Sequence, residues 1–375
     1  MTQKISIIGA GIGGLTLALA LKRAGFIPTI YESAAEIKPV GAGIVMAGNA
    51  MQVFEKLGIR QKVEAAGRKI SKLNITDAML QPIVEVDLRR FEQRYGVCNI
   101  AIHRADLQSI LAEEVGFQDI KLSKRLTKVE KNKDFRLTFE DGSTGGCDFL
   151  FGADGIHSQV RKQVFDIGKV RDTGQRCWRG VTKIGKQISM AEETFEAWGK
   201  GRRFGASQVN EEYLYWFAVI NESLMEGKDI PTLFKDFHPD ILKIISDTEE
   251  TDIFFNKIID LRPISIWQRE GACLIGDAAH ATTPNMGQGA CQAVEDAYVL
   301  GELLKRGNDF SQAFQAYEKI RMKKAHAVVR NSWWVGKAAH FENSWSRKLR
   351  DTVIKATPDS LKNRQLEKFF NIDYF

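Results

Sequence analysis

The chain has 375 residues, of which 44% are hydrophobic and only 8 are proline, and its net charge is +6. A chain of this length accommodates about two domains, and this composition excludes a largely disordered or fibrous protein. The charge surplus is small, and no basic run alternates with stacking aromatic residues, so nucleic acid is not expected as a partner.

The cysteine and histidine patterns exclude a disulfide framework and the common zinc motifs. The five cysteines are odd in number and form no C-x-x-C pair, which is typical of a reduced, intracellular protein. The six histidines show no metal-binding spacing such as H-E-x-x-H, so no metal site is expected. We therefore expect a cytoplasmic protein without a structural metal.

The first elements in chain order form a βαβ unit. Residues 5–8 are an apolar run that ends at glycines, as buried parallel strands do. Residues 15–24 are good helix formers that stop at Gly25, and residues 29–32 form a second strand. The uncharged stretch 5–21 is short for a membrane span and glycines interrupt it, so strand, turn and helix explain it better than an anchor.

The middle of the chain is rich in strands and its last part in helices. Residues 135–139 alternate with period two before an Asp141-Gly142 turn. Aromatic and β-branched residues predict an antiparallel sheet from residues 177–184, 194–198 and 213–220. Further expected elements are strands at 149–151 and 272–275, a long helix at 288–305, and helices from 312 onward with a break near Thr357-Pro358.

The first motif is the G-x-G-x-x-G pattern of Gly9, Gly11 and Gly14 between the first strand and helix. Gly9 permits the tight turn, Gly11 lets the backbone approach a pyrophosphate, and Gly14 lets helix and strand pack closely. The helix N-terminus offers free N–H groups to the phosphates. Glu32 ends the second strand, where a carboxylate holds a ribose hydroxyl. The motif predicts dinucleotide binding without distinguishing NAD from FAD.

Two further motifs follow: Gly152-Ala153-Asp154-Gly155 with Arg161, and Gly276-Asp277-Ala278-Ala279-His280 with Pro284-x-x-Gly287-Gln288-Gly289. In this order and spacing, the three motifs resemble those of the single-component FAD-dependent monooxygenases, the para-hydroxybenzoate hydroxylase family. The resemblance covers nearly the whole chain. Within the family, it extends to the branch that holds urate and salicylate hydroxylases and zeaxanthin epoxidase.

The resemblance implies an α/β fold with a discontinuous Rossmann-like FAD-binding domain, an antiparallel β-sheet substrate domain and a C-terminal helical region. The expected FAD-binding domain comprises residues 1–70, 98–168 and 264–330. The expected substrate domain comprises 71–97 and 169–263, and the helical region is 331–375.

The resemblance also implies non-covalent FAD, with NAD(P)H as co-substrate. Asp277 would accept hydrogen bonds from the sugar-alcohol chain of the flavin, while Asp154 and Arg161 would link FAD binding to NAD(P)H use. Arg104 would approach the flavin, and Val45 and Leu126 would contribute backbone contacts. The positions expected to bind the cofactor are Gly9, Gly11, Gly13, Gly14, Glu32, Val45, Arg104, Leu126, Asp154, Gly155, Arg161, Gly276, Asp277, Pro284, Gly287, Gln288 and Gly289.

The implied reaction uses NAD(P)H and O₂ to hydroxylate an aromatic or heteroaromatic small molecule through a flavin C4a-hydroperoxide. Arg203 and Tyr215 match active-site positions of the urate hydroxylases and are the expected catalytic residues. Arg179 and Pro284 join them as expected substrate contacts. The urate enzymes carry asparagine where this chain has Arg179, which leaves the substrate open. His280 is expected to be structural.

Several other functions remain possible interpretations of the sequence beside the hydroxylase. They are an isoprenoid or alkene epoxidase of the same family, an oxygen-independent flavin reductase, and a non-catalytic flavin-binding regulatory protein. The C-terminal tail carries four aromatic residues among basic ones: Trp333, Trp334, Phe341 and Trp345. We expect this stripe to pack on its own domain and expect no membrane association. The sequence predicts no oligomeric state.

Overall fold

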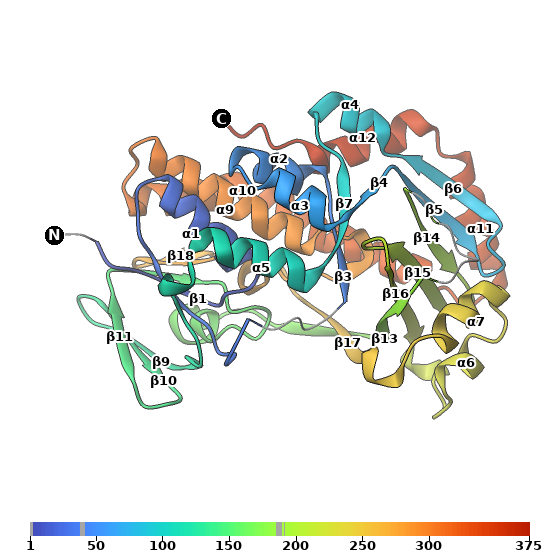
Figure 1. Cartoon of the computed structure of the whole chain (residues 1–375), viewed down its shortest axis with the longest axis horizontal. Helices are drawn as coiled ribbons and strands as arrows, with labels where there is room; N and C mark the ends of the chain where they lie inside the picture. Colours follow the sequence, from blue (N-terminus) through green and yellow to red (C-terminus); the bar gives the residue numbers. More distant parts are fainter. Residues whose placement is uncertain (1–2, 38–41, 185–189, 191) are drawn as a thin grey trace.

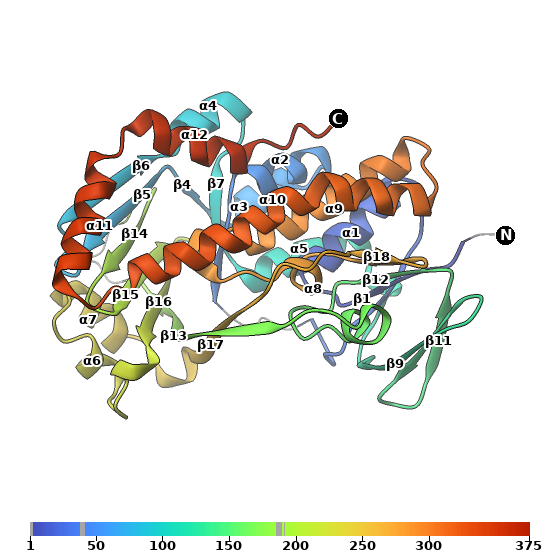
Figure 2. The ribbon, with the colours of Figure 1, turned by 180° about the vertical axis from the view of Figure 1, so that it is seen from behind.

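The computed structural model describes residues 3–37, 42–184, 190 and 192–375, so small parts of the expected domain spans lie outside the described residues. The fold has two halves, each built on a large sheet (Figure 1). A six-stranded sheet with helices lies toward the N-terminus, and a seven-stranded sheet lies at the other end of the long axis. The long helix α10 (Phe310–Ala339) runs from one half to the other, as Figure 2 shows from behind.

The six-stranded sheet is parallel except at one edge, where β18 and β19 are antiparallel. Its order is β18 (Gln268–Arg269), β19 (Ala272–Leu274), β12 (Phe149–Gly152), β1 (Ile5–Ile8), β2 (Thr29–Tyr31) and β8 (Ile120–Lys121). All four residues of β1 are buried, as the apolar run predicted. This confirms a Rossmann-like sheet assembled from segments far apart in the sequence.

Helix α1 (Ile12–Arg23) begins three residues before the predicted position. The predicted helix began at Leu15, after Gly13 and Gly14. In the structure, close packing requires them. A Cβ built on Gly14 would lie 2.0 Å from the carbonyl oxygen of Gly9, so the first turn of α1 can approach the strand-end loop only with glycine there.

The seven-stranded sheet is antiparallel, as predicted, except for one pairing. Its order is β17 (Ile253–Leu261), β13 (Val170–Lys183), β16 (Tyr213–Asn221), β15 (Arg202–Gln208), β14 (Glu193–Trp198), β5 (Lys72–Asp77) and β6 (Pro82–Asp87). Strand β14 pairs with β5 in parallel, which the sequence analysis did not predict. The difference arises because β5 belongs to an earlier segment of the chain, so no tight turn constrains its direction.

Two three-stranded sheets and the remaining helices complete the fold. The first small sheet contains β3 (Gly43–Met46), β7 (Asn99–His103) and β4 (Arg68–Ile70), and the second contains β11 (Thr144–Cys147), β10 (Phe135–Phe139) and β9 (Leu126–Lys131). The helices are α2 (Gly48–Lys56), α3 (Arg60–Ala66), α4 (Arg89–Tyr95), α5 (Arg104–Val115), α6 (Ile230–Leu233), α7 (Pro239–Ser246), α8 (Asp277–His280), α9 (Gly289–Lys305), α11 (Ser344–Ala356) and α12 (Asp359–Phe370). Short helical turns are η1 (Phe117–Asp119), η2 (Arg161–Phe165), η3 (Glu222–Leu224), η4 (Glu250–Asp252) and η5 (Pro284–Met286).

The C-terminal part is helical with the predicted break between α11 and α12, but two of its tryptophans do not pack. Trp345 is 81% exposed and Trp334 is 69% exposed, so the predicted packing of these two side chains is wrong. Trp333 differs, because the guanidinium of Arg171 lies 4.0 Å from its ring centre. Among the described residues, no helix is long and apolar enough to cross a bilayer.

His340 is buried at the end of α10, so we expect the stability of the fold to fall at acidic pH. Its Nδ1 lies 2.9 Å from the carbonyl oxygen of Gly336, and burial lowers its pKa to about 3, with Arg203 adding to the effect. Below pH ~6.5 the unfolded chain therefore takes up a proton that the folded chain refuses. We expect the stability to fall by about 1.4 kcal/mol per pH unit from this residue as the pH drops from ~6.5 toward 3.

The substitution His340→Gln should make that pH dependence shallower by one proton, as measured by urea unfolding between pH 7 and pH 4. His157→Gln, at an exposed position, is the matched control. Equal slopes for His340→Gln and the parent chain would contradict the prediction.

Candidate active site

A cavity of about 660 Å³ lies between the two large sheets. One wall contains parts of all three glycine motifs, including Gly11, Gly155 and Gly287. The opposite wall is the face of β13, β16 and β17, with β3 at the side. The topology thus brings the three motifs, far apart in the sequence, to one space facing the second sheet.

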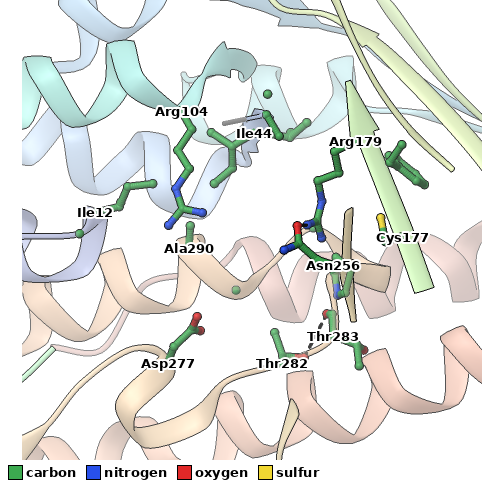
Figure 3. Close-up of a pocket in the computed structure, with 18 of the residues that line it drawn as sticks. Ile12, Ile44, Arg104, Cys177, Arg179, Asn256, Asp277, Thr282, Thr283 and Ala290 are labelled. Carbon is green, nitrogen blue, oxygen red and sulfur yellow. Dashed lines mark hydrogen bonds between the residues drawn. The ribbon is translucent and has the colours of Figure 1, made fainter. Parts of the chain in front are cut away.

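Two charged side chains enter this cavity without hydrogen-bond partners among the described residues: Arg104 at the start of α5 and Asp277 at the start of α8. Figure 3 shows them on opposite sides of the cavity, pointing toward the same space. The surrounding protein desolvates the Asp277 carboxylate and so raises its pKa, while electrostatic interactions with His280 and Arg104 oppose that rise. Unpaired polar groups of this kind are typical of a ligand site.

Glu32 lies at the end of β2, as predicted, but its carboxylate is hydrogen-bonded to the backbone of the glycine loop. It accepts hydrogen bonds from the backbone N–H groups of Ala10, at 2.7 Å, and Ala34, at 2.8 Å. It does not line the cavity. The other expected cofactor positions that do not line it are Gly9, Gly14, Leu126, Asp154, Arg161 and Gln288.

Asp154 and Arg161 hold the second motif together. The Asp154 carboxylate accepts hydrogen bonds from Ser158 Oγ at 2.5 Å and from the backbone N–H of Gln159 at 2.6 Å, although burial raises its pKa. Arg161 is buried and donates to the carbonyl oxygen of Ala278 at 2.9 Å. Its contact therefore joins the second motif to the third, next to Asp277.

The substrate-side residues predicted from the sequence meet on the opposite wall. Arg179, on β13, donates to Asn256 Oδ1 on β17 at 3.2 Å, and Figure 3 shows this pair facing the cavity. Burial raises the pKa of Tyr215, on β16, to about 12, and the positive charge of Arg179 opposes the rise. Tyr215 therefore keeps its proton at neutral pH and can donate a hydrogen bond.

Arg203 lines the same cavity, but its charge is already paired. It is 1% exposed and forms an ion pair with Glu196 at 2.8 Å. It also donates to Asn285, which lies beside Pro284 in the third motif. Arg203 thus connects the seven-stranded sheet to the loop of the third motif, whereas Arg179 carries the freer positive charge.

The aromatic part of the cavity wall was not predicted from the sequence. Phe217, Phe254 and Phe255 line it together with Cys177 and Val219. Phe254 and Phe255 are adjacent on β17, and both are exposed. Consecutive aromatic residues on an edge strand are a signal that could have marked this wall, because one of two neighbours in a strand otherwise faces away from a core.

The buried charges behind the third motif were not predicted either. Arg321, on α10, is fully buried and lies 2.7 Å from Glu295 and 2.9 Å from Asp296, both on α9. Asp296 in turn contacts His280 at 2.6 Å, and His280 does not line the cavity, as expected for a structural residue. The adjacent acidic residues Glu295 and Asp296, within the largely apolar stretch 288–305, could have indicated these buried charges.

Two side-chain amides, of Asn49 and Gln292, join this charge cluster to the loop of the third motif. The Asn49 side chain, on α2, donates to Gln288 Oε1 at 3.0 Å and to Glu295 Oε1 at 2.6 Å. Gln288 immediately precedes α9, whose first residue lines the cavity. The cluster therefore fixes the position of the helix N-terminus that borders the site.

The family model described as an FAD binding domain matches residues 2–332. The chain belongs to this FAD-dependent monooxygenase family. It is 36% identical over 358 residues to the aurachin C monooxygenase/isomerase of Stigmatella aurantiaca, covering 94% of this chain and 93% of that protein. It is 29% identical to the 2-heptyl-3-hydroxy-4(1H)-quinolone synthase of Pseudomonas aeruginosa, covering 98% of this chain and 97% of the other.

The fold of this monooxygenase also matches a crystal structure of Klebsiella pneumoniae HpxO in complex with FAD and uric acid. The TM-score is 0.90 and the identity is 26%, and the match covers 98% of this chain and 96% of that chain. The enzyme is therefore an FAD-dependent monooxygenase of the aromatic-hydroxylase type that uses NAD(P)H.

The residues of this monooxygenase fit FAD. Gly11, Gly155 and Gly287 line the cavity, and a Cβ built on any of them would meet no protein atom within 4 Å. The absence of side chains there therefore leaves room for a ligand. Arg104 presents an unpaired positive charge suited to a phosphate, and Asp277 presents free acceptors suited to hydroxyl groups. Two sizeable helices, α1 and α9, begin beside the cavity.

Proposed function

We propose that this monooxygenase hydroxylates a bicyclic nitrogen heteroaromatic of the 4-quinolone type that carries an apolar side chain. The observation that carries the proposal is the wall opposite the glycine motifs. That wall combines the donors Arg179 and Tyr215 and the amide Asn256 with the aromatic rings of Phe217, Phe254 and Phe255. The name of the Pseudomonas relative specifies an alkylated quinolone, in agreement with this combination.

The polar residues would orient the ring. The neutral hydroxyl of Tyr215 and the guanidinium of Arg179 donate to a ring carbonyl oxygen, and the carboxamide of Asn256 bonds a ring N–H. The phenylalanines cover the apolar chain and exclude water. Arg203, already paired with Glu196, would position Pro284 and its loop rather than bind an anion.

We propose that FAD occupies the side of the cavity formed by the glycine motifs. Gly11 and the N-terminus of α1 bind the pyrophosphate, Arg104 adds a positive charge, and Asp277 accepts hydrogen bonds from the sugar-alcohol hydroxyls. The remaining contacts come from the motif positions that line the cavity: Gly13, Val45, Gly155, Gly276, Pro284, Gly287 and Gly289. Bound FAD supplies the electron transfer from NAD(P)H and the activation of O₂.

The test is anaerobic reduction of the FAD-loaded enzyme by NADH and NADPH in stopped flow. The panel contains 2-heptyl-4(1H)-quinolone, urate and salicylate. We expect the quinolone to accelerate flavin reduction at least about tenfold and, with O₂ present, to gain one oxygen atom. Acceleration by urate or salicylate alone would refute the proposed substrate class, and reduction at one rate with every compound would indicate a reductase.

The variant Arg179→Ala should weaken quinolone binding about tenfold to a hundredfold, because it removes a charge-assisted hydrogen bond. Lys183→Ala is the matched control, since Lys183 is an exposed residue of the same strand that does not line the cavity. Substrate dissociation constants are measured from the change in flavin absorbance. Equal constants for Arg179→Ala and the parent enzyme would contradict the assignment of Arg179.

A further inference from the structure

Helix α11 has an inner face that fixes its orientation. Arg350 is 7% exposed and donates to the carbonyl oxygens of Ala338 at 3.1 Å and Ala339 at 3.2 Å, at the end of α10. Its guanidinium also lies 4.8 Å from the ring centre of Trp198. The rotation of α11 about its own axis is therefore determined by a buried contact, not by its outer side chains.

The outer face of α11 is apolar. Trp345 is 81% exposed, Leu349 is 67% exposed and Val353 is 56% exposed. The spacing of four residues places these three side chains on one side of the helix, so they form a continuous stripe. Both cartoon views place α11 at the outer end of the long axis, beyond the seven-stranded sheet (Figures 1 and 2).

The stripe is bordered by positive charge. Lys348 and Lys355 are exposed and seven residues apart, so they lie on the same side of the helix. Neither has an ion-pair partner among the residues that the structure describes. By contrast, Lys362 on the next helix is paired with Asp359 at 3.1 Å. An apolar stripe bordered by unpaired lysines is complementary to a surface whose outer layer is anionic and whose deeper layer is apolar, as in a lipid bilayer with anionic headgroups.

We propose that α11 binds the surface of a bilayer that contains anionic lipids. Trp345, Leu349 and Val353 would enter the headgroup and upper acyl region, and Lys348 and Lys355 would bind lipid phosphates. The enzyme would then be a peripheral membrane protein without crossing the bilayer. This inference does not depend on the substrate proposed above.

A second copy of the chain fits this face less well. A two-fold interface through the stripe would bring Lys348 and Lys355 close to their own counterparts, and like charges repel. Three side chains also cover much less than the ~800 Å² per partner that a stable dimer typically buries. An anionic bilayer meets neither obstacle, because it provides the opposite charge and has no fixed contact area.

The test is co-sedimentation of the FAD-loaded full chain with vesicles. Vesicles of phosphatidylcholine alone are compared with vesicles that also contain phosphatidylglycerol, each at low and high salt. We expect binding to the anionic vesicles that weakens at high salt, because screening reduces the lysine contribution. Binding should shift the tryptophan emission to shorter wavelength in the parent enzyme but not in Trp345→Phe.

The charge and apolar contributions are separated by variants. Lys348→Ala and Lys355→Ala should each lower the partition coefficient for anionic vesicles about fivefold. Trp345→Ser should lower it further, without changing the melting temperature. Phe117→Ser and Lys133→Ala are the controls, since Phe117 and Lys133 are exposed outside the C-terminal helices, and they should bind like the parent.

Two results would overturn the proposal. One is sedimentation that is the same for the parent, the lysine variants and Trp345→Ser, or absent with every vesicle. The other is concentration-dependent self-association that Trp345→Ser abolishes, which would assign the stripe to a second copy.

Discussion

The variant Gly11→Ala is expected to fold like the parent chain and to bind FAD about tenfold to a hundredfold more weakly. A Cβ at this position meets no protein atom within 4 Å, and the backbone there is extended, with φ −71° and ψ 177°, which alanine adopts without strain. Gly11 lines the cavity, so the added methyl group occupies space that the pyrophosphate needs.

The measurements are the melting temperature of the FAD-free protein and the FAD dissociation constant from flavin fluorescence. Gly14→Ala is the informative partner, because its Cβ would lie 2.0 Å from the Gly9 carbonyl oxygen. That variant should lose both stability and FAD binding. Unchanged FAD affinity in Gly11→Ala would show that the pyrophosphate does not approach this loop.

Replacing Arg321 with methionine should destabilise the protein by about 3–5 kcal/mol, because it leaves buried carboxylates without their main cation. Glu295 and Asp296 are fully buried, and Arg321 contacts both. Burial alone would raise the pKa of Glu295, yet Arg321 and Lys324 lower it. Without Arg321, Glu295 must either protonate or remain charged in a poorly compensated interior.

Urea unfolding followed by circular dichroism measures this loss. Lys319→Met, at an exposed position of the same helix, is the matched control and should change stability by less than about 0.5 kcal/mol. Adding Asp296→Asn to Arg321→Met should recover part of the loss, since it removes one uncompensated charge. A loss below about 1 kcal/mol in Arg321→Met would show that Lys324 and His280 suffice to balance the carboxylates.

The sequence predicted those parts of the site whose residue types have a local physical meaning. The βαβ unit, the glycine loop and the approach of the three motifs follow from strand, turn and helix signals together with the family resemblance. Arg104, Asp277, Arg179 and Tyr215 line the cavity, and their roles there stay predictions. These residues lie at the ends or on the faces of elements that the sequence itself marks.

The parts that were not predicted depend on contacts between distant segments. Nothing local in the sequence indicates that Asp154 and Arg161 bond their own loop and Ala278 rather than the cavity. The parallel pairing of β14 with β5 and the pairing of Arg203 with Glu196 arise only when the sheet is assembled. The exposure of Trp345 likewise depends on Arg350 holding the opposite face of α11.

The order of strands in the six-stranded sheet has a consequence for biosynthesis. Strand β1 lies between β2 and β12, and β12 pairs with β19, which begins at residue 272. At ~5–20 residues per second, about 13–53 s pass between the synthesis of β1 and that of β19. The βαβ unit gains its own neighbours, β8 and β12, by residue 152, but β12 lacks β19 until the end of this interval, and Asp277 does not yet exist. We therefore expect FAD to bind only after most of the chain has been synthesised. The yield of FAD-loaded enzyme should then depend on how well chaperones protect the unpaired strands of the incomplete sheet.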